Sequence, residues 1–217
     1  GPGEYAAARC HRAGALDFIE YVHIFENKGK EIGVTITHPH GQIYAYPFVP
    51  PRMRTRRESF DHWRRDNGSC LLCDLLAREL EEEPRLAAAN EQVVAFVPFY
   101  ARYPYEVHIL PRDHSVRLGE FTRETAASLA AILKTVMVKY DGLWGFSMPY
   151  IMNLLPEPSD GRGDPGWHFH IEFTPPYRSP QKLKYLAGAE SGADAFINDA
   201  LPENTAAELR AVDAGLE

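Results

Sequence analysis

"VTITHPHGQIYAYPF", residues 34–48, sets two histidines on either side of a proline and follows them with glycine and glutamine. Its β-branched and aromatic residues predict a β-strand. Residues two apart on a strand share a face, so we expect the side chains of His38, His40 and Gln42 to lie in one row. A single histidine in a strand is more often a structural residue that forms a hydrogen bond than a catalyst. Three polar side chains on one face, beside Gly41, are costly to bury without a role, so this stretch is the candidate functional site.

A second stretch, "GWHFHIEFTPP" at residues 166–176, repeats the pattern. Three positions match: His38 with His168, His40 with His170, and Gln42 with Glu172. Asn27 precedes the first histidine pair much as Asn153 precedes the second, and both stretches lead into a Pro-Pro pair. These matches predict a duplicated domain.

The order of the remaining patterns predicts the fold class. Strand-like segments follow one another as in a meander, and "FTRETAASLAAILKTVMVKYDG" at residues 121–142 is the clearest helix. Thr122 is expected to be its N-cap. Consecutive strands with one long helix predict an α+β fold built on an antiparallel sheet with packed helices.

The two copies differ in extent. The second reads as complete over residues 70–176, whereas nothing before Tyr21 resembles residues 70–114. The first copy is therefore expected to be incomplete. We expect residues 1–60 to form the C-terminal part of the first domain and residues 61–217 to form the second, complete domain.

Composition excludes some classes of protein. Of the 217 residues, 45% are hydrophobic, which is enough for a sizeable core. The net charge of −7 argues against a general nucleic-acid binder. The basic run "PPRMRTRRESFDHWRR", residues 50–65, is interpreted as a solvated helix face. No apolar run reaches the roughly 20 residues that span a bilayer, and no secretion signal is recognised, so we expect no membrane association and a cytoplasmic location.

Two of the three cysteines, Cys70 and Cys73, form a C-x-x-C motif at the start of a predicted helix. In a chain without a secretion signal this spacing favours metal binding or redox chemistry over a structural disulfide. No thioredoxin-like βαβ pattern surrounds the motif, which makes redox chemistry the weaker interpretation. A reduced, buried cysteine pair is the remaining alternative.

"FENKGKEIGVTITHPHGQIY", residues 25–44, resembles the active-site segment of the galactose-1-phosphate uridylyltransferase family, within the histidine-triad superfamily. The resemblance continues through residues 97–114 and 167–190 and covers nearly the whole chain. It implies a duplicated histidine-triad-like antiparallel sheet with packed helices. Histidine-triad hydrolases carry a further alternating histidine where this chain has Gln42.

The resemblance implies that UMP is exchanged between UDP-glucose and galactose 1-phosphate through a uridylyl-histidine. His40 would attack the α-phosphorus of UDP-glucose. Two successive displacements would then replace a direct attack of one anionic substrate, galactose 1-phosphate, on the other, UDP-glucose. Imidazole suits this task because it is largely neutral near pH 7. A backbone carbonyl of residues 38–40 would hold its other ring nitrogen. Gln42 would donate to a phosphoryl oxygen without supplying a proton for hydrolysis.

Substrate-binding residues are also implied by the resemblance. Positions that contact the nucleotide in the family match Asn27, Gly33 and Thr35. Positions of the hexose-binding loop, usually contributed across a dimer, match Lys184, Tyr185 and Glu190. Ala189 replaces a more polar residue. Taken alone, "KYLAGAE" at residues 184–190 is the end of a helix.

The superfamily often builds a structural zinc site from a C-x-x-C motif and two histidines. The matching positions here are Cys70, Cys73, His114 and His168. Two thiolates and two imidazoles suit tetrahedral zinc with no open position. No iron is expected, since Leu155 and Glu172 stand where we expect the histidine ligands of the relatives' iron site.

Two other functions stay open. The chain could be a related nucleotidyltransferase or phosphorylase that uses an ADP-sugar or a dinucleoside polyphosphate. It could also be a non-catalytic fragment or subunit that binds nucleotide sugars. The expected partners are UDP-glucose, galactose 1-phosphate, and either a second copy of the chain or a separate N-terminal half.

Overall fold

The computed structural model describes residues 13–36 and 38–215. Its centre is a seven-stranded sheet in the order β2-β1-β6-β7-β5-β4-β3, in which every neighbouring pair is antiparallel. Strands β8 and β9 form a separate ribbon. The strand bounds are β1 Tyr21–Lys28, β2 Gly41–Tyr46, β3 Leu86–Ala89, β4 Val93–Phe96, β5 Val107–Pro111, β6 Tyr150–Leu155, β7 His170–Thr174, β8 Tyr177–Ser179 and β9 Lys182–Leu183.

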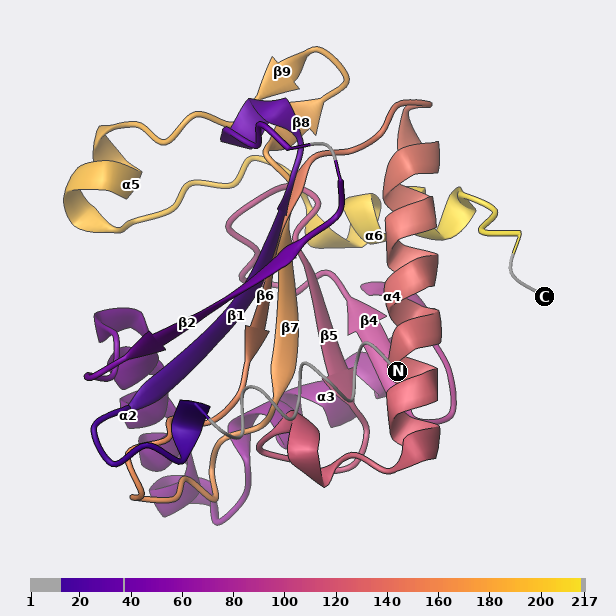
Figure 1. Cartoon of the computed structure of the whole chain (residues 1–217). Coiled ribbons are helices and arrows are strands. Elements are labelled where there is room, and N and C mark those ends of the chain that lie inside the picture. The colour runs from indigo at the N-terminus through magenta and orange to yellow at the C-terminus, as the bar shows by residue number, and fades with distance from the viewer. Residues whose placement is uncertain (1–12, 37, 216–217) are drawn as a thin grey trace.

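Helices cover both faces of this sheet, which confirms the α+β prediction (Figure 1). In Figure 1, α4 runs along one side of the sheet, and α5 is part of a loop that extends beyond one end of the sheet. The helix bounds are α2 Pro51–Asn67, α3 Leu71–Glu82, α4 Arg123–Leu143, α5 Gly188–Ala193 and α6 Pro202–Ala211, with 3-10 turns η1 at Lys30–Ile32 and η2 at Leu118–Glu120. Within the described part of the chain, none of these helices combines the length and apolar character needed to cross a membrane.

The two copies of the repeat meet at the pairing of β1 with β6. Phe25 pairs with Gln42 of β2, and Asn153 pairs with Glu172 of β7. Phe25 and Asn153 also pair with each other. The equivalent strand pairs β1–β2 and β6–β7 are therefore related by an approximate two-fold axis through the Phe25–Asn153 pair.

This register corrects one detail of the repeat. The sequence match set Asn27 against Asn153, but the ladders make Phe25 the counterpart of Asn153, because Gln42 corresponds to Glu172. The match is wrong by two residues. A shift of two keeps the same side chains on the same face, so the sequence pattern could not distinguish the two alignments.

A two-sided core surrounds the strands of the second copy. Strand β4 is buried along its whole length, with Val93 and Ala95 in the core beneath α4 and Val94 and Phe96 in the core beneath α2 and α3. Alternation along a strand sends successive side chains to opposite faces, so a strand between two helical layers needs apolar residues throughout. By contrast, β2 at the other end of the sheet is mostly exposed.

Local signals explain where the main helices begin and end. The Thr122 hydroxyl accepts a hydrogen bond from the Thr125 N–H at 3.0 Å, as its predicted N-cap role requires. Helix α2 begins with Pro51 and ends before Gly68, whose φ of 75° is in the left-handed region that favours glycine. Helix α2 runs through the expected boundary between residues 60 and 61, so that boundary stays a prediction.

Candidate active site and metal centre

The two histidines of the H-P-H-G-Q stretch precede β2, which begins at Gly41. The prediction that His38, His40 and Gln42 share one strand is therefore wrong for the histidines and holds for Gln42. Pro39 explains the difference, because proline has no N–H to donate to a strand ladder. His38 is exposed and His40 is half-buried.

A local hydrogen bond fixes the His40 ring. Its Nδ1 lies 2.8 Å from the carbonyl oxygen of His38. A carbonyl can only accept, so Nδ1 carries the proton and Nε2 carries the lone pair. The predicted contact between a backbone carbonyl and the second ring nitrogen is confirmed. Among the described residues nothing hydrogen-bonds to Nε2, which leaves it available as a nucleophile.

The residues assigned to nucleotide contact lie on the segment that leads to His40. Asn27 is in β1, opposite Ile151 of β6. Gly33 closes the η1 turn with its N–H 3.0 Å from the Lys30 carbonyl, at a φ of 86° that favours glycine. Thr35 is exposed between η1 and the histidines. The structure thus gathers Asn27, Gly33, Thr35 and His40 on one strand-and-loop unit, while their roles stay predictions.

His170, the counterpart of His40, is in a different environment. Its Nδ1 also lies 2.8 Å from a carbonyl oxygen, that of His168. Its Nε2, however, is 2.5 Å from Nη1 of Arg56, a donor that occupies the lone pair. Burial and then the Arg56 charge lower the pKa of His170 to about 3. His170 is therefore neutral and blocked at the atom that would have to attack.

Arg56 also forms an ion pair with Glu172, as does Arg52 one helical turn earlier. Burial alone would raise the pKa of Glu172, but the Arg56 guanidinium and other positive groups hold it well below its usual value. Burial of the Arg56 and Arg57 side chains contradicts a fully solvated face for the basic run. The missed signal was the i, i+4 spacing of Arg52 and Arg56, which sets both on one side of a helix.

Glu106 and His108 extend this buried group. His108 Nε2 lies 2.8 Å from Glu106 Oε1 and 3.5 Å from Glu172 Oε1. His108 and Glu172 are paired neighbours on β5 and β7. Sequence reasoning missed this cluster because Glu172 on β7 is far along the chain from Glu106 and His108. Arg52 and Arg56 both pair with Glu172, so two guanidinium groups offset the two carboxylates of this network.

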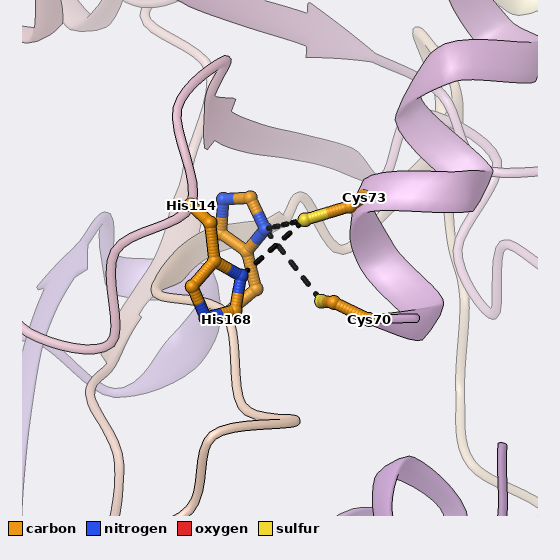
Figure 2. Close-up of side chains that lie close together, drawn as sticks. All are labelled: Cys70, Cys73, His114 and His168. Atoms are coloured by element: carbon orange, nitrogen blue, oxygen red, sulfur yellow. Dashed lines mark hydrogen bonds between the residues drawn. The ribbon is translucent and has the colours of Figure 1, made fainter. Parts of the chain in front are cut away.

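A second cluster joins the start of α3 to two loops. The ligand-type atoms of Cys70, Cys73, His114 and His168 all lie within 4.8 Å of one another. Figure 2 shows the two cysteines on the first turn of α3 and the two imidazoles facing them. His114 Nδ1 and His168 Nδ1 are each 3.3 Å from the Cys73 sulfur. The structure therefore brings together all four predicted metal-site residues.

The chemistry of these donors fits a zinc ion. A hydrogen bond with Cys73, reinforced by His168, lowers the pKa of the Cys70 thiol to about 4 against the effect of burial. The same contact raises the pKa of Cys73, so the pair readily holds one negative charge without a metal. His168 Nε2 donates to the Pro111 carbonyl at 3.1 Å, which turns Nδ1 toward the thiols. An outer partner of this kind is usual for a ligating histidine.

The predicted hexose-loop residues lie around α5. Lys184 Nζ is 3.3 Å from Glu190 Oε1. The Glu190 carboxylate also accepts from the Ala187 N–H at 3.1 Å and the Ile197 N–H at 3.4 Å, and backbone hydrogen bonds lower its pKa. Lys184 and Glu190 thus close the loop on itself. Tyr185 is 77% exposed.

Comparisons with known proteins agree with this arrangement. The family described as galactose-1-phosphate uridyl transferase, C-terminal domain, matches residues 56–215, and its N-terminal domain matches residues 6–50. The galactose-1-phosphate uridylyltransferase of Thermotoga maritima is 44% identical over 195 residues, which are 89% of this chain and 61% of that protein. The chain thus spans less than two thirds of that relative.

Solved structures give the same result. A uridylyltransferase structure superposes with a TM-score of 0.89 at 43% identity, covering 96% of this chain and 65% of the other. An ADP-glucose phosphorylase from Arabidopsis thaliana gives a TM-score of 0.83 at 26% identity, covering 97% and 65%. The resemblance predicted from residues 25–44 is confirmed. With the family match over residues 56–215, the conclusion is that the chain belongs to the galactose-1-phosphate uridyl transferase family.

Proposed function

We propose that the chain carries the nucleophile of a transferase that exchanges UMP between UDP-glucose and galactose 1-phosphate. The observation that carries this proposal is the His40 ring, whose Nδ1 is held by the His38 carbonyl at 2.8 Å. Its Nε2 lone pair meets no partner among the described residues. The matching nitrogen of His170 is blocked by Arg56, so the first copy is the reactive one.

In the first displacement His40 Nε2 bonds to the α-phosphorus of UDP-glucose. The bond from that phosphorus to the bridging oxygen breaks, and glucose 1-phosphate leaves. Oxygen of the galactose 1-phosphate phosphate then attacks the uridylyl-histidine, which releases UDP-galactose and restores neutral His40. The proton on Nδ1 stays hydrogen-bonded to the His38 carbonyl in both steps. No proton therefore has to move between the two ring nitrogens.

Gln42 is proposed to donate from its side-chain amide to a phosphoryl oxygen. Asn27, Gly33 and Thr35 are proposed to contact the nucleotide, and Lys184, Tyr185 and Glu190 the hexose. Lys184 and Glu190 would have to exchange their mutual contact for the sugar. Tyr185 is exposed and could contact the hexose without giving up such an ion pair.

Cys70, Cys73, His114 and His168 are proposed to hold one structural zinc ion. A closed set of four protein ligands leaves no position for substrate, so the ion would stabilise the second domain and take no part in the transfer. We also propose a cytoplasmic location, where thiols remain reduced and able to bind metal.

We propose that residues 1–60 belong to the first copy and 61–217 to the second. Strand β7 has β5 as its outer neighbour, whereas β2, its counterpart, is the edge of the described sheet. This difference supports pairing of β2 with a further strand, from a second copy of the chain or from an N-terminal half. Sedimentation of the chain alone and after addition of that half distinguishes the two.

The proposal is tested by intact mass after incubation with UDP-glucose, and separately with ADP-glucose. Wild-type protein is expected to gain one uridylyl group from UDP-glucose, and His40→Asn is expected to gain none. His62→Asn is the matched control, since His62 is an exposed histidine on α2. An adduct that persists in His40→Asn would contradict the proposal, and an adenylyl adduct would change the nucleotide assigned to the site.

A further inference from the structure

Gln42 has one partner among the described side chains, and it is the hydroxyl of Tyr44. The Tyr44 oxygen lies 3.2 Å from Gln42 Oε1. Both residues belong to β2, and positions two apart on a strand project from the same face. The contact is therefore built into the strand that follows His40.

Neighbouring rings hold the Tyr44 side chain in place. Its ring meets the Phe25 ring edge-on, with centroids 5.0 Å apart and planes at 86°. The Tyr46 ring is a second neighbour, with its centroid 6.3 Å away and its plane at 72°. Edge-to-face contacts of this kind are favourable geometries for aromatic pairs. The hydroxyl is thus presented to Gln42 from a ring that has two aromatic neighbours.

The orientation of the Gln42 carboxamide matters for its proposed role. The group has an accepting oxygen at one end and a donating NH2 at the other. A phosphoryl oxygen is negatively charged and needs the NH2. When the Tyr44 hydroxyl donates to Oε1, the oxygen is engaged and the NH2 remains for the phosphoryl group. A carboxamide turned by 180° would set its oxygen against the anion.

We infer that Tyr44 is a positioning residue that fixes the Gln42 amide for uridylyl transfer. This inference rests on the proposed function, because it needs Gln42 to meet the phosphoryl group. The second copy supports it by contrast. There the positions of Gln42 and Tyr44 are taken by Glu172 and Thr174, and the Thr174 hydroxyl donates to the Ile151 carbonyl instead. The glutamine–tyrosine pair occurs only in the copy with an open histidine.

The expected effect is modest, because Tyr44 is 48% exposed and water competes for its hydroxyl. A neutral hydrogen bond of this kind corresponds to about a two- to tenfold change in rate. Tyr44→Phe removes the hydroxyl and retains the ring contacts with Phe25 and Tyr46. Tyr46→Phe is the matched control, since it makes the same deletion on a tyrosine that forms no hydrogen bond with Gln42.

The experiment measures uridylyl-His40 formation in a single turnover at varied UDP-glucose. Tyr44→Phe is expected to lower the limiting rate about two- to tenfold with the half-saturating concentration unchanged. Tyr46→Phe is expected to match the wild type. In a Gln42→Ala background the Tyr44→Phe substitution should have no further effect, because the group that it positions is gone.

A measurement that does not depend on turnover accompanies the kinetics. The Gln42 side-chain NH2 signals in a 15N-correlated NMR spectrum are identified by their loss in Gln42→Ala. They are expected to shift in Tyr44→Phe and to stay in place in Tyr46→Phe. A merely structural role of Tyr44 would not produce the non-additive rates together with this shift.

The outcomes separate the inference from the proposed function. No adduct in the wild type overturns both. An adduct that forms at equal rates in the wild type and Tyr44→Phe overturns the role of Tyr44 alone. Equal rate losses from Tyr44→Phe with and without Gln42 also overturn it, since the two side chains would then act independently.

Discussion

His40 and His170 occupy equivalent positions in the two repeats. In each, Nδ1 lies 2.8 Å from the carbonyl oxygen of the histidine two positions earlier. This local hydrogen bond is thus preserved in both copies. Their surroundings differ, because His40 lies before the strand at the edge of the described sheet, while His170 lies beneath α2 and receives a hydrogen bond from Arg56 at Nε2. The first repeat therefore leaves Nε2 of its histidine without a partner among the described residues, whereas the second buries the equivalent histidine and occupies its Nε2.

The first prediction concerns the atom of His40 that carries the uridylyl group. Since Nδ1 carries the proton to the His38 carbonyl, we expect the phosphorus on Nε2. Long-range 15N–1H and 31P correlation spectra of the adduct distinguish the two ring positions, with the two synthetic phosphohistidine isomers as standards. Phosphorus on Nδ1 would show that the imidazole ring rotates away from the His38 carbonyl before it attacks.

The second prediction is one tightly held zinc ion per chain. Cys73→Ser should remove most of the metal, because the Cys73 sulfur contacts both histidines. The second domain should lose several kcal/mol of stability, since metal binding and folding are linked. In a domain of this size each kcal/mol corresponds to about 2–4 °C in Tm.

Elemental analysis and thermal unfolding, with and without a chelator, check this zinc prediction. His62→Gln is the control, because His62 is an exposed histidine that pairs with Asp66 on the surface of α2. Its zinc content and Tm should match the wild type. Equal zinc in Cys73→Ser and the wild type would refute the assignment of the four ligands.

The third prediction is that Arg56→Met is strongly destabilising. It leaves the Glu172 carboxylate buried without its closest positive partner, which typically costs about 3–5 kcal/mol. Arg52→Met should cost less, because the Arg52 side chain is 47% exposed and surface pairs contribute about 0–1 kcal/mol. Urea unfolding at pH 7 measures both, and equal losses would contradict the ranking.

The same pair gives a pH dependence with a defined sign. The pKa of Glu172 is lower in the folded chain than in the unfolded one, so its stabilisation is fully present above the unfolded value of about 4.5. It is lost as the pH falls through the lower folded value. The wild type should therefore lose more stability than Arg56→Met between about pH 5 and pH 3, and parallel losses would exclude this contribution.

The fourth prediction concerns Lys139, which closes the C-terminus of α6. Its Nζ donates to the Leu209 carbonyl at 3.0 Å and the Val212 carbonyl at 2.8 Å. Lys139→Met keeps the length of the side chain and removes these donors, which should cost about 1.5–3 kcal/mol. Lys134→Met, at an exposed position on the same helix, should stay within about 0.5 kcal/mol of the wild type. Thermal unfolding compares the two, and a neutral Lys139→Met would show that α6 docks without this cap.

Much of the site could be predicted from residues close together in the chain. The carbonyl contact of His40 spans two residues, and the C-x-x-C motif spans one helical turn, so both follow from local geometry. The long helix, its Thr122 cap and the antiparallel fold class also depend on local patterns. The strand around His38 and His40 was wrongly predicted because strand propensity competed with the missing N–H of Pro39.

The sequence by itself therefore determined the family, the repeat, the histidine proposed as the nucleophile and the four residues suited to a metal. Only the tertiary structure decided that Arg56 blocks His170, that Phe25 rather than Asn27 is the counterpart of Asn153, and that part of the basic run is buried. Arg56 and His170 are 114 residues apart, and their contact arises when α2 packs on the sheet. The physical reason is range: turns and caps depend on neighbours within a few positions, whereas strand register and buried ion pairs depend on which distant surfaces exclude water together.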